Sequence, residues 1–283
     1  MAYPAAEFRV VANNRIRSLL WPREHGAWGI LLVPLVTGAG AAKGVGERLG
    51  LVLLLAVAAL ALFCLRTPVE SLLGTTPMRA QTARERRAAR SMIALMAAIS
   101  ALEVAVLLWF GNWDLLPVGL FAAAAFLVQT GVKKLGRAAR MPAQMVGALG
   151  LTSTAAAACC IVAGRLDSNA FVLWLANWLF ASDQIHFVQL RIHAARASGR
   201  AEKFAQGRAF VIGQFAMMLV LALVYWGGWL PATALVAFVP VLLRGFAWFF
   251  AKPQPLLVHR LGITELVHAI TFGVLLIVGY RLG

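Results

Sequence analysis

The chain has 283 residues, of which 61% are hydrophobic and only 13% are charged, and its formal net charge is +15. A soluble domain is nearer one half apolar and one quarter charged, so this composition excludes an ordinary soluble protein. The apolar excess falls in runs of about 20 residues, long enough to cross a hydrocarbon core, which predicts an all-α, polytopic membrane protein. The basic residues lie in alternate loops and form no contiguous basic domain. We therefore expect membrane lipids as partners, and no nucleic acid.

A basic, amphipathic leader is expected over residues 1–24, followed by a single nine-helix transmembrane domain over residues 25–283. Arg9, Arg15 and Arg17 interrupt the apolar residues of the leader, so we expect no cleavable signal peptide. The alternation of apolar residues with arginines instead suits a short helix that lies in the membrane interface.

Nine apolar runs follow the leader. The fifth is rich in Ala, Gly, Ser and Thr, small residues that let helix backbones approach closely, which predicts a central, well-packed helix. Two long polar connections, 66–90 and 191–208, follow the second and sixth runs. The predicted membrane-spanning helices cover residues 26–42, 49–65, 91–110, 115–132, 142–163, 170–190, 209–226, 230–250 and 261–280.

The distribution of loop charge predicts the orientation of the chain. With nine crossings, all but four of the 26 Lys and Arg residues fall on the same side as the leader. The four on the other side are Lys43, Arg48, Arg165 and Arg281. Because cytoplasmic loops carry the excess of Lys and Arg, we expect a cytoplasmic N-terminus and a C-terminus outside.

Ionisable residues near the cytoplasmic ends of the first, sixth and ninth runs are candidates for a polar site. Carboxylates and imidazoles at this depth are costly against lipid, so we expect them to face the bundle interior. Within two of the pairs the residues are three apart and share a helix face. The sequence thus predicts one cytoplasm-facing cavity. Its candidate catalytic residues are Glu24, His25, Asp183, His186, Glu265 and His268.

Other roles for these residues stay open. The pairs could simply hydrogen-bond neighbouring helices as part of the packing. A carboxylate followed three residues later by His is also the ligand pattern of di-iron bundles, so the same six residues are candidate ligands of a divalent metal. Arg66, Arg84 and Arg191 are candidate substrate- or anion-binding residues, because Arg pairs bidentately with phosphate. The positive-inside rule explains these arginines equally well.

Three motifs indicate a family. PREHGAWG at the start of the first run, RTP at the end of the second and LGITELVHA at the start of the ninth resemble the YwiC-like family of bacterial membrane proteins. The resemblance covers essentially the whole chain, and PREHGAWG is its most specific part. It implies a fold and a multi-pass location in the bacterial inner membrane more than an activity.

The layout also resembles the UbiA superfamily of intramembrane prenyltransferases, which have nine helices and functional loops after helices two and six. That resemblance implies a UbiA-like bundle in which Glu24 and His25 lie beside Glu265 and His268. In the superfamily, aspartate-rich motifs hold Mg²⁺ on a prenyl diphosphate. This chain departs from the pattern, because its first region offers Glu70 and Glu85 among arginines and its second offers Asp183 within the span.

Three classes of function therefore stay open. The first is a degenerate UbiA-type enzyme that handles a prenyl group or lipid, with an isoprenoid or another amphipathic ligand. The second is a transporter or channel for a small solute or proton, with Glu103 as a further candidate relay. The third is a non-catalytic membrane component that binds a quinone, a haem, a metal or a partner subunit.

Overall fold

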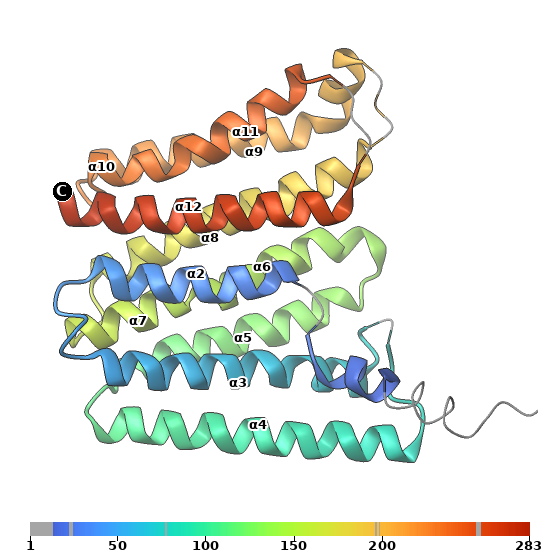
Figure 1. Cartoon of the computed structure of the whole chain (residues 1–283), viewed down its shortest axis with the longest axis vertical. Helices are drawn as coiled ribbons and strands as arrows, with labels where there is room; N and C mark the ends of the chain where they lie inside the picture. The colour runs from blue at the N-terminus through green and yellow to red at the C-terminus, as the bar shows by residue number, and fades with distance from the viewer. Residues whose placement is uncertain (1–13, 23–24, 77, 196, 198, 253–255) are drawn as a thin grey trace, which may run out of the picture.

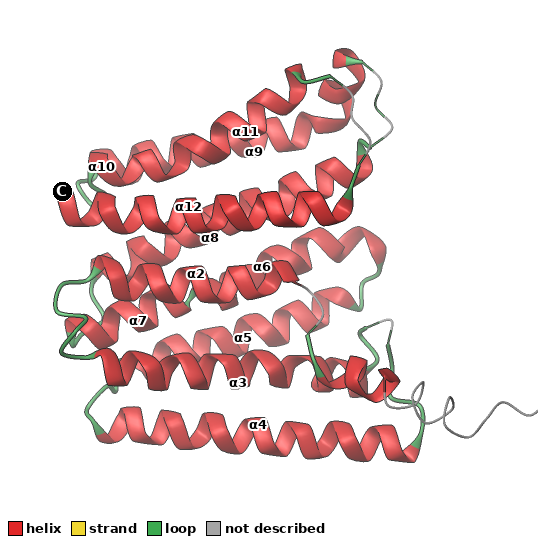
Figure 2. Ribbon diagram, viewed as in Figure 1, coloured by secondary structure: helices red, strands yellow, loops and turns green. Residues whose placement is uncertain are grey.

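The protein is a stack of roughly parallel helices that alternate in direction (Figure 1). The structure, a computed structural model, describes residues 14–22, 25–76, 78–195, 197, 199–252 and 256–283. Over these residues the regular secondary structure is helical, without strands (Figure 2). The blue start of α2 and the C-terminus lie at opposite ends of the helices. We call the end that carries the α3–α4, α5–α6, α8–α9 and α11–α12 connections the basic end.

Every predicted membrane-spanning run is helical. A short helix covers 14–20, and a 3₁₀ turn, η1 (Arg137–Ala139), precedes α6. The long elements are α2 (His25–Ala41), α3 (Leu49–Leu73), α4 (Ala83–Trp109), α5 (Leu115–Lys133), α6 (Arg140–Thr152) continued by α7 (Thr154–Ala163), α8 (Ser168–His193), α9 (Arg200–Trp226), α10 (Ala232–Leu235) continued by η2 (Val236–Phe238) and α11 (Val239–Phe250), and α12 (Val258–Leu282).

Seven helical segments in the described part of the chain are long and apolar enough to cross a membrane. Two predicted spans, those in α2 and α8, do not belong to that group, and the reason for each is clear. The described α2 has 17 residues, slightly short of a full crossing. The helix α8 is long, but it carries Asn177, Asp183, Gln184, His186 and Gln189, which lower its hydropathy. The chain is thus an all-helical membrane protein, while the count of nine crossings stays a prediction.

The two long loops predicted after the second and sixth runs are shorter in the structure. The helix α3 continues through Pro68 to Leu73, because the Ser71 hydroxyl donates to the Pro68 carbonyl and Glu70 is held by ion pairs. The next helix begins at Ala83 after a capping box, in which Thr82 and Glu85 satisfy each other's free backbone N–H groups. Similarly, α8 ends at His193 and α9 begins at Arg200.

The small residues of the fifth run form the packing centre, as predicted. Ala155, Ala156 and Ala158 of α7 are fully buried. Gly38 of α2 lies so close that a Cβ there would meet the Ala155 carbonyl oxygen at 2.1 Å. The absence of a side chain at Gly38 therefore allows α2 and α7 to pack backbone to backbone.

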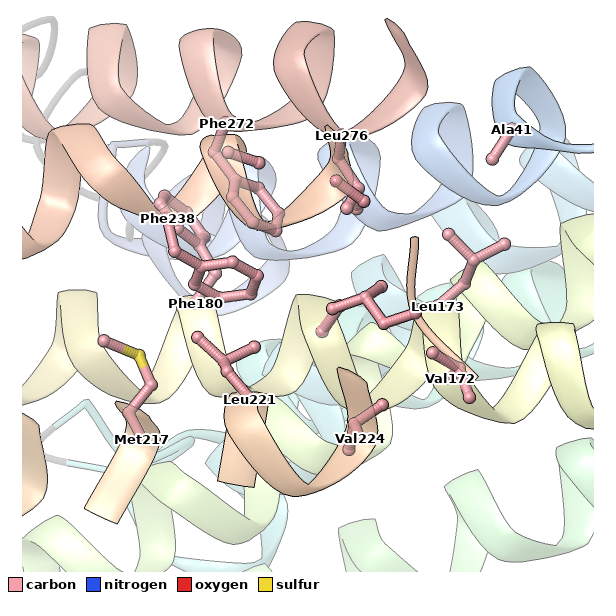
Figure 3. Packing of buried hydrophobic residues seen from close by; sticks show 14 of the residues in the cluster. Ala41, Val172, Leu173, Phe180, Met217, Leu221, Val224, Phe238, Phe272 and Leu276 are labelled. Atoms are coloured by element: carbon pink, nitrogen blue, oxygen red, sulfur yellow. The ribbon is translucent and has the colours of Figure 1, made fainter. Parts of the chain in front are cut away.

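A second core joins α8 and α9 to the C-terminal helices (Figure 3). The Phe180 and Phe272 rings stack with centroids 4.1 Å apart, and Phe238 meets Phe272 edge-on at 5.2 Å. Met217 and Leu221 of α9 close the same core. This apolar packing fixes α8 against α12 and thereby sets the position of the polar residues one to two turns nearer the basic end.

Candidate functional site

A buried ion cluster connects three helices in the C-terminal half. From α11, the guanidinium of Arg244 donates through Nη2 to Oδ2 of Asp183 on α8 and through Nη1 to Oε2 of Glu265 on α12. The three side chains are 9%, 1% and 7% exposed, respectively. We call these residues, with Gln184 and Gln214, the Arg244 cluster.

Two glutamines extend the cluster. Gln214 brings in the fourth helix, α9, because its amide nitrogen donates to Oδ1 of Asp183. The Gln184 amide donates to the backbone carbonyl of Glu265 at 2.7 Å, which ties α8 directly to α12. The Arg244 guanidinium also lies 4.2 Å from the centre of the Phe187 ring, an arrangement that stabilises a partly desolvated cation.

The cluster lies inside the helices and not in a loop. At a rise of 1.5 Å per residue, Arg244 is about 9 Å from the end of α11, and Glu265 is about 10 Å from the start of α12. Both helix ends belong to the basic end of the bundle. The depth of Asp183 and Glu265 in the membrane stays a prediction.

The charges of the cluster do not balance. Two carboxylates share one guanidinium, so with all three groups ionised the formal charge is −1. A buried charge without a counter-charge costs several kcal/mol. Within the described part of the chain, Oε1 of Glu265, Oε1 of Gln214 and Nε of Arg244 are buried without a hydrogen-bond partner. The arrangement can therefore accept a proton at Glu265.

The other predicted site residues lie around this cluster in different ways. Glu24 falls outside the described residues, and of His25 only its place at the start of α2 is described. Helix α2 does pack against α12 as expected. His186 meets Phe210 of α9 edge-on, with ring centroids 5.3 Å apart. His268 turns back to its own helix, with Nδ1 2.8 Å from the Thr264 carbonyl oxygen.

The described residues offer no metal site of the predicted kind. Among them, no three His, Cys, Asp or Glu side chains come close enough together to hold a metal ion. The Arg244 cluster itself places a cation between its two carboxylates. This geometry suits charge compensation by arginine and does not suit the bridging of two metals.

The three candidate anion-binding arginines have separate environments. Arg66 donates to Oε1 of Glu70 at 3.0 Å, and Lys133 of α5 donates to the same oxygen at 2.6 Å. Glu70 is buried, so this second ion cluster joins α3 to α5. Arg84 is exposed in the first turn of α4. Arg191 lines a cavity at the basic end, between α8, α9 and α11.

Sequence reasoning missed Arg244 and Gln214. In the distribution of loop charge, Arg244 counted only as one of the basic residues on the leader side, whereas the structure places it inside α11. The signal was present, because an arginine within the apolar run 230–250 needs a buried acid or a wet cavity. The acid that pairs with Arg244 depends on how α8, α11 and α12 pack. The apolar runs of the sequence do not specify that packing.

The comparisons concern mainly the N-terminal half. Residues 21–160 match the family described as YwiC-like protein. This region holds the PREHGAWG and RTP motifs and ends within α7, so the Arg244 cluster lies beyond it. No curated protein and no solved structure matches the chain, and the UbiA-like arrangement stays a prediction. Over residues 21–160, this chain is thus similar to the YwiC-like protein family.

Proposed function

We propose that this membrane protein transports a small solute and that the Arg244 cluster exchanges the proton that drives the transport. The observation that supports this function is the sharing of one guanidinium by two buried carboxylates, Asp183 and Glu265. Ionisable residues inside helical membrane proteins typically mark ion pathways and proton relays. A proton on the second carboxylate would balance the charge of the cluster.

The cluster is also placed to couple protonation to movement. Arg244 holds α11 to both α8 and α12. Addition of a proton to Asp183 or Glu265 would remove one of the two charge-assisted contacts and weaken one helix pair selectively. A ligand shifts a conformational equilibrium only through different affinities for its two states, and a proton at this position would have them.

The space beside the cluster suits a water molecule, through which a proton could reach the carboxylates. The cavity next to Gln184, lined also by Asn177 and by Gly29 and Val33 of α2, measures about 10 Å³. That is room for about one water molecule.

Transport can be tested in proteoliposomes with a pH-sensitive dye inside. We would apply a panel of amino acids, organic acids and sugars, and record solute-dependent changes of internal pH and of current on a solid-supported membrane. A solute that drives proton movement in the wild type should fail to do so with Glu265→Gln. Glu47→Gln, the same change on an exposed connection, serves as the control.

A comparison of Glu103→Gln with Glu265→Gln tests which of the two carboxylates carries the proton. Glu103 lies partly buried on α4, a helix at the opposite side of the stack from α11 and α12 (Figure 1). Loss of proton movement in Glu103→Gln, with wild-type behaviour of Glu265→Gln, would assign the proton pathway to α4 and overturn the proposal.

A further inference from the structure

A second polar feature lies at the basic end, and one of its residues, Arg191, also interacts electrostatically with Glu265 of the Arg244 cluster. It is a cavity of about 90 Å³ between the ends of α8, α9 and α11. Three cationic side chains line it, and none of its described lining residues is acidic. We call it the basic cavity. It is lined by Arg191, Ala194, Ala195, Ala197, Lys203, Trp248, Ala251, Lys252 and Leu256.

We propose that the basic cavity binds a phosphate group, as carried by the headgroup of an acidic phospholipid. The volume of the basic cavity corresponds to roughly six water molecules, which is enough for one tetrahedral oxyanion. Three like charges around one small space repel each other, and an anion between them relieves that repulsion. The cavity lies where the helices leave the apolar core, at the level expected for headgroups.

Lys203 is the buried cation of this site, and hydrogen bonds hold its side chain in place. It is only 4% exposed, although it lies in the first turn of α9. Its Nζ donates to the carbonyl oxygens of Trp248 at 3.0 Å and Ala251 at 2.7 Å, which belong to the C-terminal end of α11. An ammonium group has three donors, of which these carbonyls accept two, and Nζ also lies 4.9 Å from the Trp248 ring centre. The same contacts offset the negative end of the α11 dipole, which would otherwise repel an anion.

The other cations complete the cavity from two sides. Arg191, in the last turn of α8, is partly buried and lies with its guanidinium 5.9 Å from the Phe187 ring centre. Lys252 follows α11 and is exposed. A planar guanidinium can hold two phosphate oxygens at once, while an ammonium acts as a point charge. Trp248 adds a ring of the type that prefers the membrane interface.

The site can be tested by thermal unfolding of the purified full-length protein in detergent. In separate arms we would add phosphatidylglycerol, phosphatidylcholine, or inorganic phosphate with sodium chloride as the ionic-strength control. The variant Arg191→Gln/Lys252→Gln removes two charges from the cavity. Lys134→Gln/Arg260→Gln removes two charges from exposed positions at the same end of the bundle and is the matched control.

Phosphatidylglycerol should raise the wild-type unfolding midpoint more than phosphatidylcholine does. Its apparent affinity should fall about tenfold in the cavity variant, as for the loss of one charge-assisted hydrogen bond, and stay unchanged in the control. A shift with inorganic phosphate that depends on the same two residues would identify a soluble anion as the ligand. Equal losses in both double variants, or no wild-type shift in any arm, would overturn the proposal. If the cavity variant does not fold, Lys252→Gln alone takes its place with the same expectation.

Discussion

Arg244 of α11 and Glu265 of α12 form a buried ion pair, and the same guanidinium reaches Asp183 of α8. The ion pair joins α11 to α12. It lies between the apolar core of the bundle and the basic end. Because both carboxylates accept hydrogen bonds from this one guanidinium, a change of Arg244 affects both of them.

Replacement of Arg244 by Met should be strongly destabilising, because it leaves two buried carboxylates without a counter-charge. We expect a loss of about 3–5 kcal/mol in the free energy of unfolding, the usual cost of removing one partner of a buried pair. Arg260→Met removes an exposed positive charge from α12 and should change stability little. The measurement is reversible unfolding in mixed micelles.

A variant without any of the three charges distinguishes the effect of charge on stability from the effect of packing. Asp183→Asn/Arg244→Met/Glu265→Gln removes all three charges together and should recover much of the stability lost in Arg244→Met. If the triple variant is no more stable than Arg244→Met, then the packing of the arginine stem, and not charge compensation, is what holds these helices.

Gly38 should tolerate no side chain. In Gly38→Ala the new Cβ would lie 2.1 Å from the Ala155 carbonyl oxygen, so α2 and α7 must separate. We expect a loss of about 1–3 kcal/mol, as for other overpacked interiors. Gly50→Ala on α3 meets no atom within 4 Å and should be neutral or slightly stabilising, since Ala favours a helix. Equal melting curves for the two variants would contradict this close helix contact.

The start of α4 should depend on its capping box. Thr82→Ala removes the acceptor for the Glu85 backbone N–H and should cost about 1 kcal/mol. Glu85→Ala should cost more, because Glu85 also accepts from the backbone of Gln81 and Thr82 and from Arg15 of the leader. Arg15→Ala alone should cost under about 1 kcal/mol, since that side chain is well exposed. Hydrogen exchange at the first turn of α4 would rank the three.

The helices and their packing centre could be predicted because they depend on run length and residue size. The run 142–163 shows this directly, since its small residues predict close packing without any knowledge of its neighbours. The extension of α3 through Pro68 could not be predicted, because it depends on Lys133 of α5 meeting Glu70. Likewise, Asp183 and Glu265 were identifiable from their depth, whereas the arginine between them required the arrangement of three helices.

The orientation of the chain is the last prediction, and α5 offers the simplest measurement. Leu135 and Trp113 lie just beyond its two ends and are 77% and 62% exposed. The native cysteines Cys64, Cys159 and Cys160 are buried, so their background labelling should be low.

Because most Lys and Arg residues flank the Leu135 end, the positive-inside rule places that end in the cytoplasm. A membrane-impermeant maleimide should therefore label Trp113→Cys in intact spheroplasts and label Leu135→Cys only after permeabilisation. Labelling of both positions in intact spheroplasts would indicate leaky cells, which a cytoplasmic marker protein controls for. The reverse pattern would mean that loop charge does not set the orientation, and it would place the Arg244 cluster and the basic cavity at the outer face of the membrane.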